Sequence, residues 1–142
     1  MRPPILANAG LEAALKWLTQ EYAQKYGSQI RFFDDGQSKP LLYEKRTILF
    51  QAARELLLNV VKHAHCSEAY LAVQRSGTEL RMTVTDNGVG FTANEAEAVG
   101  QGAAGFGLFN VTQKLSHIHG RLNIDALAVA GTRIVVTVPL DL

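Results

Sequence analysis

The chain has 142 residues, 47% of them hydrophobic and 19% charged, and 14 Lys and Arg against 13 Asp and Glu give a net charge of +1. This length is typical of one domain, and so apolar and nearly neutral a chain is not disordered. The charge balance gives no sign of nucleic acid or an anionic membrane as a partner. The single cysteine, Cys66, excludes an internal disulfide, and no apolar run is long enough for a transmembrane helix.

Hydrophobic periodicity predicts the elements of the first half of the chain. Residues 11–26 carry leucines at helical spacing, and Gly27 follows as a stop signal. Residues 29–33 form a short predicted strand that ends at the turn signal Asp-Asp-Gly of residues 34–36. A long helix is predicted over residues 41–64, with apolar side chains at helical spacing toward the core.

The second half is richer in strands. A hairpin of two strands, a helix that Gly120 closes, and two final strands are predicted at residues 69–75, 79–85, 106–119, 122–126 and 133–138. Strands and helices do not alternate one for one, which disfavours a doubly wound parallel sheet. The order favours an α+β fold, a sandwich of a mixed sheet with helices on one face.

One side of the long predicted helix carries several polar residues. Glu55, Asn59, Lys62 and His63 lie at i, i+4, i+7 and i+8, and Gln51 extends this stripe by one turn. A solvated helix face has the same pattern. Asn59 argues against that interpretation, because Asn is a poor helix former whose amide oxygen suits a metal or ligand contact.

A second candidate site follows the second strand of the hairpin. Asp86 ends this strand, and Gly88 and Gly90 come next. A tight turn needs one glycine, whereas two glycines behind an acid allow a ligand to approach the backbone. A carboxylate there can accept a hydrogen bond from an amino group such as that of adenine. The residues alone fit a turn and a ligand loop equally well.

A run of glycines leads into the helix at residue 106. Gly100, Gly102, Gly105 and Gly107 are typical either of a flexible loop or of a segment that presents free N–H groups to phosphate. The run also matches the dinucleotide fingerprint, with Asp125 further on, but no strand precedes it and too little chain follows for that fold. The histidines do not have the spacing of a zinc site.

Together these motifs resemble the ATP-binding catalytic domain of bacterial sensor histidine kinases, whose superfamily includes gyrase, heat-shock chaperones and MutL proteins. The long-helix segment is similar to the asparagine box of this family, in its nitrate-sensor-like and lipid-thermosensor-like version. Two further segments are similar to the first and second glycine boxes, and a last one to the terminal Gly-Thr pair. These segments are residues 54–64, 86–91, 105–108 and 131–132.

The resemblance implies a fold, cofactors and a domain layout. The fold is the two-layer sandwich of the histidine-kinase and gyrase ATPases, called the Bergerat fold. One ATP-binding catalytic domain would span residues 1–142, with residues 1–9 as a leader or linker remnant and residues 91–105 as the ATP lid. ATP and Mg²⁺ would be the cofactors.

The resemblance also implies a role for each site residue. Asp86 would accept the adenine amino group, with Thr132 supporting it through a water. Asn59 would hold Mg²⁺, and Glu55 would orient or deprotonate water or support the metal. The remaining residues would line the phosphates, allow close approach of the nucleotide, or hinge the lid and present N–H groups: Lys62, His63, Gly88, Gly90, Gly105, Gly107 and Leu108.

Two departures from the family pattern shape the predicted function. The Arg-Glu-Arg run of many relatives is absent after the second glycine box, where only Lys114 keeps a positive charge. None of the four histidines is followed by an acid, as the phosphoacceptor histidine is in such kinases. We therefore expect the chain to donate the γ-phosphate to a histidine on a separate dimerisation domain, and not to phosphorylate itself.

The expected partners are that dimerisation domain and a response regulator, in the cytoplasm, with no direct membrane contact by this chain even if its parent protein is membrane-anchored. Two alternatives share the fold. One is a serine kinase of the anti-sigma-factor type, and the other is a nucleotide-binding module without catalysis.

Overall fold

The computed structural model describes residues 10–63, 68–87, 106–126 and 131–142. In this part of the chain, one mixed sheet has the strand order β1-β2-β3-β5-β4. Only β1 and β2 pair in parallel, and the other neighbours are antiparallel. The strands are β1 (Gln29–Asp34), β2 (Glu68–Ser76), β3 (Glu79–Asp86), β4 (Arg121–Ala126) and β5 (Thr132–Pro139).

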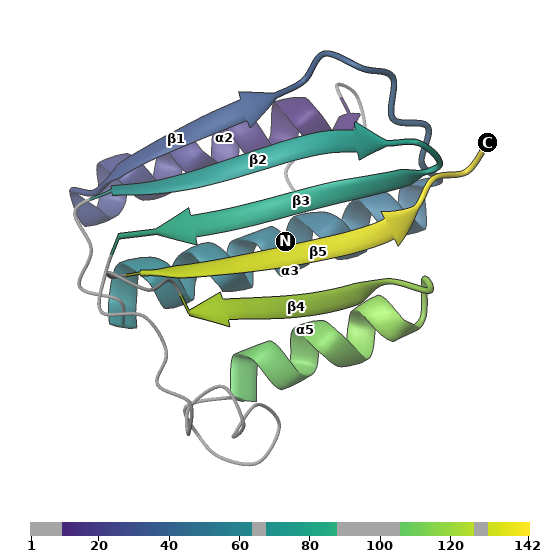
Figure 1. Cartoon of the computed structure of the whole chain (residues 1–142). Helices are drawn as coiled ribbons and strands as arrows, with labels where there is room; N and C mark the ends of the chain where they lie inside the picture. The colour runs from purple at the N-terminus through teal and green to yellow at the C-terminus, as the bar shows by residue number, and fades with distance from the viewer. Residues whose placement is uncertain (1–9, 64–67, 88–105, 127–130) are drawn as a thin grey trace.

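The helices form a second layer on one face of this sheet (Figure 1). They are α2 (Gly10–Tyr26), α3 (Tyr43–His63) and α5 (Phe106–Ser116). The opposite face, turned toward the viewer in Figure 1, has no described helix over it. This arrangement confirms the predicted α+β sandwich with helices on one face.

The core lies between the two layers and follows directly from the predicted periodicities. Alternate residues of the central strands point inward, and one side of each helix is apolar. The largest fully buried side chains are Leu11, Leu15, Leu18, Leu49, Leu56, Leu57, Leu71, Leu80, Met82, Leu108 and Leu115. Burial of one such side chain contributes about 1.5–3 kcal/mol, so this layer of leucines holds α3 and α5 in place against the sheet.

The helix predicted at residues 106–119 ends earlier, at Ser116. His119 adopts a left-handed φ of 59°, and its N–H donates to the Ser116 carbonyl, while the Gly120 N–H donates to the Leu115 carbonyl at 2.8 Å. This pair of bonds is a Schellman cap, which satisfies the last helical carbonyls. Gly120 is required for space, because a Cβ there would lie 2.9 Å from Cγ2 of Val138.

Smaller differences from the predicted elements have equally local causes. The long helix starts at Tyr43, two residues after its predicted start, with the Leu42 N–H held by a carboxylate oxygen of Asp141 at 2.8 Å. Asp34 belongs to β1, because β1 stays in register with β2 up to the pair of Asp34 and Val73. These contacts come from distant segments, which local sequence patterns do not report.

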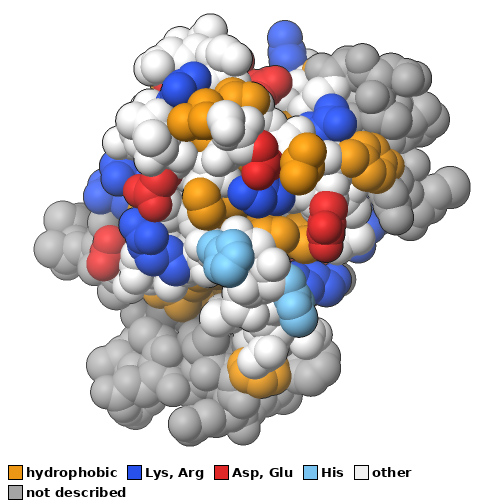
Figure 2. Space-filling view, turned by 90° about the vertical axis from the view of Figure 1, so that its right-hand side faces the viewer, with side chains coloured by type: hydrophobic (Ala, Val, Ile, Leu, Met, Phe, Trp, Pro, Cys, Tyr) orange, Lys and Arg blue, Asp and Glu red, His pale blue; other side chains and the backbone are white. Residues whose placement is uncertain are grey.

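An ionic cluster fastens the end of the sheet where β1 finishes. Lys39, whose side chain is 0% exposed, bonds Asp34 at 2.7 Å and also Asp35. Asp35 in turn accepts the backbone N–H of Arg75 at 2.8 Å. Figure 2 looks onto this end of the molecule, where acidic and basic side chains interleave with exposed hydrophobic ones. The cluster ties the loop after β1 to β2. It lies at the end of the sheet opposite to the one where β3 finishes with Asp86.

Candidate functional site

Asp86 is placed by strand periodicity on the helix-covered face of the sheet. In β3 the inward positions are Leu80, Met82 and Val84, and Asp86 is the next one in this alternation. Its side chain is accordingly buried, with 6% exposed. Asp86 is thus a buried carboxylate on the helix side of the sheet and not a solvent-exposed turn residue.

Thr132 is the register partner of Asp86 on β5, and it is also buried. Gly131, just before it, has a φ of +102°, and a Cβ there would lie only 2.0 Å from the carbonyl oxygen of Asp86. Glycine therefore permits the close approach of the two strands, and Thr132 stands opposite Asp86 in the register of β3 and β5. The reason for this glycine is tertiary and is not visible in the sequence.

Asn87 secures the end of β3, a role that sequence reasoning missed. Its side-chain oxygen accepts the Glu68 N–H at 3.1 Å, and its own N–H donates to the Glu68 carbonyl at 3.2 Å. The motif that follows Asp86 thus locks the neighbouring strand β2 to β3. These two bonds hold the backbone directly after Asp86.

Glu55 and Asn59 lie one turn apart on α3, and both are half-buried. Their neighbours Leu56 and Val60 point into the core, so the polar pair occupies the border of the helix–sheet contact. Figure 1 shows the C-terminal end of α3, the end of β3 and the start of β5 at the same end of the domain. The predicted base and metal ligand therefore share this end with Asp86 and Thr132.

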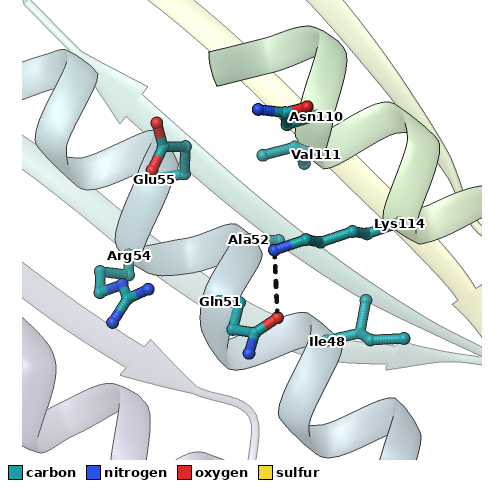
Figure 3. Close-up of a pocket in the computed structure, with 8 residues that line it drawn as sticks. All are labelled: Ile48, Gln51, Ala52, Arg54, Glu55, Asn110, Val111 and Lys114. Carbon is teal, nitrogen blue, oxygen red and sulfur yellow. Dashed lines mark hydrogen bonds between the residues drawn. The ribbon is translucent and has the colours of Figure 1, made fainter. Parts of the chain in front are cut away.

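A polar pocket of about 100 Å³ lies between α3 and α5 (Figure 3). Glu55 and Gln51 line it from α3, and Asn110 and Lys114 line it from α5. Lys114 reaches across and donates to Oε1 of Gln51 at 3.4 Å, whereas Arg54 turns toward α2. Lys114, the positive charge on α5, thus lies next to the turn of α3 that carries Glu55. The sequence alone did not show this proximity.

The surroundings of this turn of α3 include a tyrosine of α2. Burial raises the pKa of Tyr22 above its ordinary value, the charge of Arg54 opposes this effect, and Glu55 adds to it. The ring of Tyr22 meets the ring of Tyr26 edge to face, with centroids 5.7 Å apart. The charges of Arg54 and Glu55 on α3 thus act on the hydroxyl of Tyr22.

Several predicted site residues lie at the limits of what the structure describes. Lys62 and His63 belong to the last turn of α3, but their side chains are outside the described part. Gly88, Gly90, Gly105 and the predicted lid at residues 91–105 are outside it altogether. Gly107 and Leu108 belong to the first turn of α5, whose free N–H groups suit an anion. Leu108 is fully buried in the core, so a nucleotide contact there would involve its backbone.

The described residues contain no cluster of three or more His, Cys, Asp or Glu that would hold a metal ion by itself. Glu55 and Asn59 nevertheless supply two oxygen donors at adjacent turns. Mg²⁺ takes one or two protein oxygens and completes its shell with waters and substrate phosphates. The donor set therefore fits Mg²⁺ that arrives with a nucleotide.

Comparison with known proteins gives one matching family profile, described as histidine kinase-, DNA gyrase B-, and HSP90-like ATPase, over residues 44–142. Two similar curated proteins are sensor histidine kinases. The sensor histidine kinase MctS of Rhizobium johnstonii is 32% identical over 98% of this chain, and the oxygen sensor histidine kinase NreB of Staphylococcus carnosus is 25% identical over 99%. The chain spans only 30% and 39% of these two relatives.

Solved structures of similar fold are histidine kinase domains. The catalytic domain of ThkA aligns with a TM-score of 0.75 at 16% identity, over 92% of this chain and 90% of that one. The ATP-binding domain of PrrB from Mycobacterium tuberculosis gives 0.74 at 20% identity, over 93% and 95%. Full-length ShkA, in complex with AMPPNP, gives 0.79 at 18% identity, over 92% and 30%. These likenesses confirm the predicted fold.

Proposed function

Because the chain belongs to the family of histidine kinase-, DNA gyrase B- and HSP90-like ATPases, we propose that it binds Mg-ATP and donates the γ-phosphate to a histidine on a dimerisation domain outside these 142 residues. The family resemblance drawn from the asparagine and glycine motifs is confirmed by this match and by the sensor kinase relatives. The observation that carries the proposal is the buried carboxylate of Asp86 beside Thr132.

Asp86 is proposed to recognise adenine. Its carboxylate accepts a hydrogen bond from the adenine amino group, and the Thr132 hydroxyl supports this contact through a water. A hydrogen bond to a charged group is worth about 1.5–3 kcal/mol, enough to select adenine over a base with a carbonyl at that position. The AMPPNP complex of ShkA, which shares this fold, supports an adenine nucleotide as the ligand.

The phosphate end is assigned to α3 and the start of α5. Asn59 holds Mg²⁺, which neutralises charge on the phosphates when bound. Lys62 and His63 lie along the phosphates, while Gly105 and Gly107 hinge the lid. Gly88 and Gly90 leave room for the nucleotide beyond Asp86.

In the transfer step the imidazole nitrogen of a partner histidine forms a bond to the γ-phosphorus while the bond to the β–γ bridging oxygen breaks. ADP leaves, and Glu55 accepts the proton that the imidazole loses. Positioning supplies most of the catalysis in such reactions. Phosphate then passes to a response regulator.

Within the described residues, no helix is long and apolar enough to span a membrane. We keep the cytoplasm as the proposed location of the reaction, because the nucleotide and the response regulator are expected there. Membrane attachment of a larger parent protein is compatible with this location.

The two described histidines support the need for a separate acceptor. His117 and His119 follow α5, at the end of the domain shown in Figure 2, whereas Asp86 lies at the other end. A helix of 11 residues rises about 16 Å, so these rings do not reach the start of α5. The purified chain is therefore expected to bind ATP without labelling itself.

The test is transfer from γ-labelled ATP. We expect the chain to label a histidine-containing dimerisation domain of a sensor kinase with an acid-labile, base-stable phosphate, and Glu55→Gln to slow transfer while ATP still binds. Serine phosphorylation of an anti-anti-sigma protein would instead identify the anti-sigma-type kinase. ATP binding with no transfer to either partner would identify a non-catalytic module.

A further inference from the structure

The face of the sheet opposite the helices contains a broad groove of about 600 Å³. Its floor is a row of small side chains across β2, β3 and β5, and the exposed ring of Phe33 on β1 continues this row. Ala72 is the register partner of Thr83, and Thr83 is the register partner of Val135. Each alternates along its strand with buried residues that point to the helices, so all three point away from the core.

Arginines border this floor on both sides. On one side Arg81 lies opposite Thr137, and Thr137 lies opposite Arg121. On the other side, Arg133 of β5 is the register partner of Thr85 on β3. The same row crosses Tyr70 of β2 and ends at Arg31 of β1. All four guanidinium side chains are exposed. We call the floor and these four arginines the outer trough.

The outer trough has the width of an α-helix. On β3, Arg81 lies in one arginine row and Thr85 lies in the other, so the two rows are four residues apart. Four residues of a strand span about 14 Å. A helix with side chains is about 10–12 Å wide. Five strands at about 4.8 Å spacing span about 19 Å, the length of about 13 helical residues.

Acidic side chains of the described residues neutralise little of the positive charge of these arginines. Within the described residues, neither Arg81 nor Arg133 makes a hydrogen bond or ion pair. Arg121 contacts Glu79 at 3.3 Å in an exposed pair, which is weak. Asp125 is the one acid that lines the groove among the described residues. A ligand that brings carboxylates to both borders of the floor would therefore complement this surface.

We propose that the outer trough binds an amphipathic helix of a protein partner, with a narrow apolar stripe bordered by glutamate or aspartate on both sides. The stripe would cover Ala72, Thr83 and Val135 and end on Phe33 of β1, and the acids would pair with the arginines. The described lining of the groove contains no aromatic side chain, and the exposed rings of Phe33 and Tyr70 lie only at its β1 and β2 side, with Tyr70 beneath the guanidinium of Arg31 at 6.0 Å. Bases therefore have no row of rings to stack on across the trough, and the surface is too small and polar for a lipid surface. A protein helix thus fits better than a single-stranded nucleic acid or a membrane.

The test uses a labelled helical peptide of about 14 residues, with an alanine–leucine stripe between two rows of glutamate. Fluorescence anisotropy measures its binding to the full chain. A control peptide carries lysine at each glutamate position. We expect binding of the glutamate peptide alone, weaker binding at high salt, and amide chemical-shift changes confined to the outward residues of the five strands.

Two variants test the placement. Arg81→Gln with Arg133→Gln should weaken peptide binding about tenfold, whereas the matched pair Lys16→Gln with Lys25→Gln on α2 should leave it unchanged. Val135→Tyr fills the floor without a change of charge and should also abolish binding. Nucleotide affinity should not change in any of these variants. Equal binding of the two peptides, shifts outside the sheet face, or tighter binding of a single-stranded oligonucleotide would overturn the proposal.

Discussion

Asp86 and Thr132 stand directly opposite each other at the ends of β3 and β5, with 6% and 2% of their surfaces exposed. Gly131 lets the two strands meet there, because its missing side chain leaves room for the Asp86 carbonyl. A buried carboxylate and a hydroxyl are thereby fixed at one end of the sheet, on its helix side. The proposed adenine site depends on this pair.

Replacement of the carboxylate tests the adenine contact. Asp86→Asn exchanges a charged acceptor for a neutral amide, so ATP affinity should fall by about tenfold or more. GTP should bind poorly to the unaltered chain, because guanine presents a carbonyl where adenine has its amino group. Titration calorimetry with both nucleotides measures these affinities. Equal affinity for ATP and GTP would count against the assignment.

Gly131→Ala should damage the same site through the backbone. The new Cβ would clash with the Asp86 carbonyl, and the residue has a φ of +102°, so unfolding free energy should fall by about 3 kcal/mol. Gly77→Ala is the matched control, since Gly77 also has a positive φ but no atom within 4 Å of its added Cβ. It should cost about 1 kcal/mol. Urea unfolding compares the two, and equal losses would refute the close-approach argument.

Asn59→Ala tests the metal role. The amide oxygen is proposed as a ligand of Mg²⁺, so the variant should lose the part of ATP affinity that depends on Mg²⁺. Adenosine binding should remain intact, because Asn59 does not contact the base. Titration with and without Mg²⁺ separates the two effects. If the variant binds Mg-ATP as tightly as the unaltered chain does, Asn59 is only a half-buried polar residue.

The ionic cluster predicts how stability depends on acid. Burial alone would raise the pKa of Asp35, but hydrogen bonds from Lys39 and from the Arg75 and Gln37 amides lower this pKa to about 2, from an ordinary 3.8. The folded state therefore binds its proton less tightly than the unfolded state. The stabilisation is fully present above about pH 4 and is lost as the pH falls toward about 2.

Asp35→Asn should therefore lower the unfolding free energy at pH 7 by about 2 kcal/mol and flatten its fall between pH 4 and pH 2. Asp125→Asn, at an exposed position of β4, should leave the curve unchanged. Chemical unfolding at a series of pH values measures both variants. Curves of equal steepness for Asp35→Asn and the unaltered chain would contradict the role of the cluster.

The predicted elements agree closely with the structure where one periodicity dominates. In α3 the spacing of Leu56 and Val60 indicated the core side, and the predicted strand over residues 79–85 corresponds to β3. Local patterns do not report which strands are neighbours. The pairing of Asp86 with Thr132 joins segments 46 residues apart, so only the family resemblance placed both at one site.

Other features depend on tertiary contacts that the sequence does not encode locally. Residues 34–39 have the composition of a polar loop, and burial of Lys39 against two aspartates requires the fold of that loop over β2. Lys114 appeared only as a retained charge, and its approach to Gln51 follows from the packing of α5 on α3. The arginines of the outer trough are separated in sequence and meet through strand register alone.

The central claim is that this chain is an ATP-binding domain whose affinity depends on Mg²⁺ and on Asp86. Titration calorimetry of ATP into the unaltered chain and into Asp86→Asn, each with and without Mg²⁺, tests it most directly. The account predicts ATP binding by the unaltered chain, strengthened by Mg²⁺, and a loss of about tenfold or more in the variant under both conditions. No detectable ATP binding by the folded chain, or equal affinity in Asp86→Asn, would contradict it.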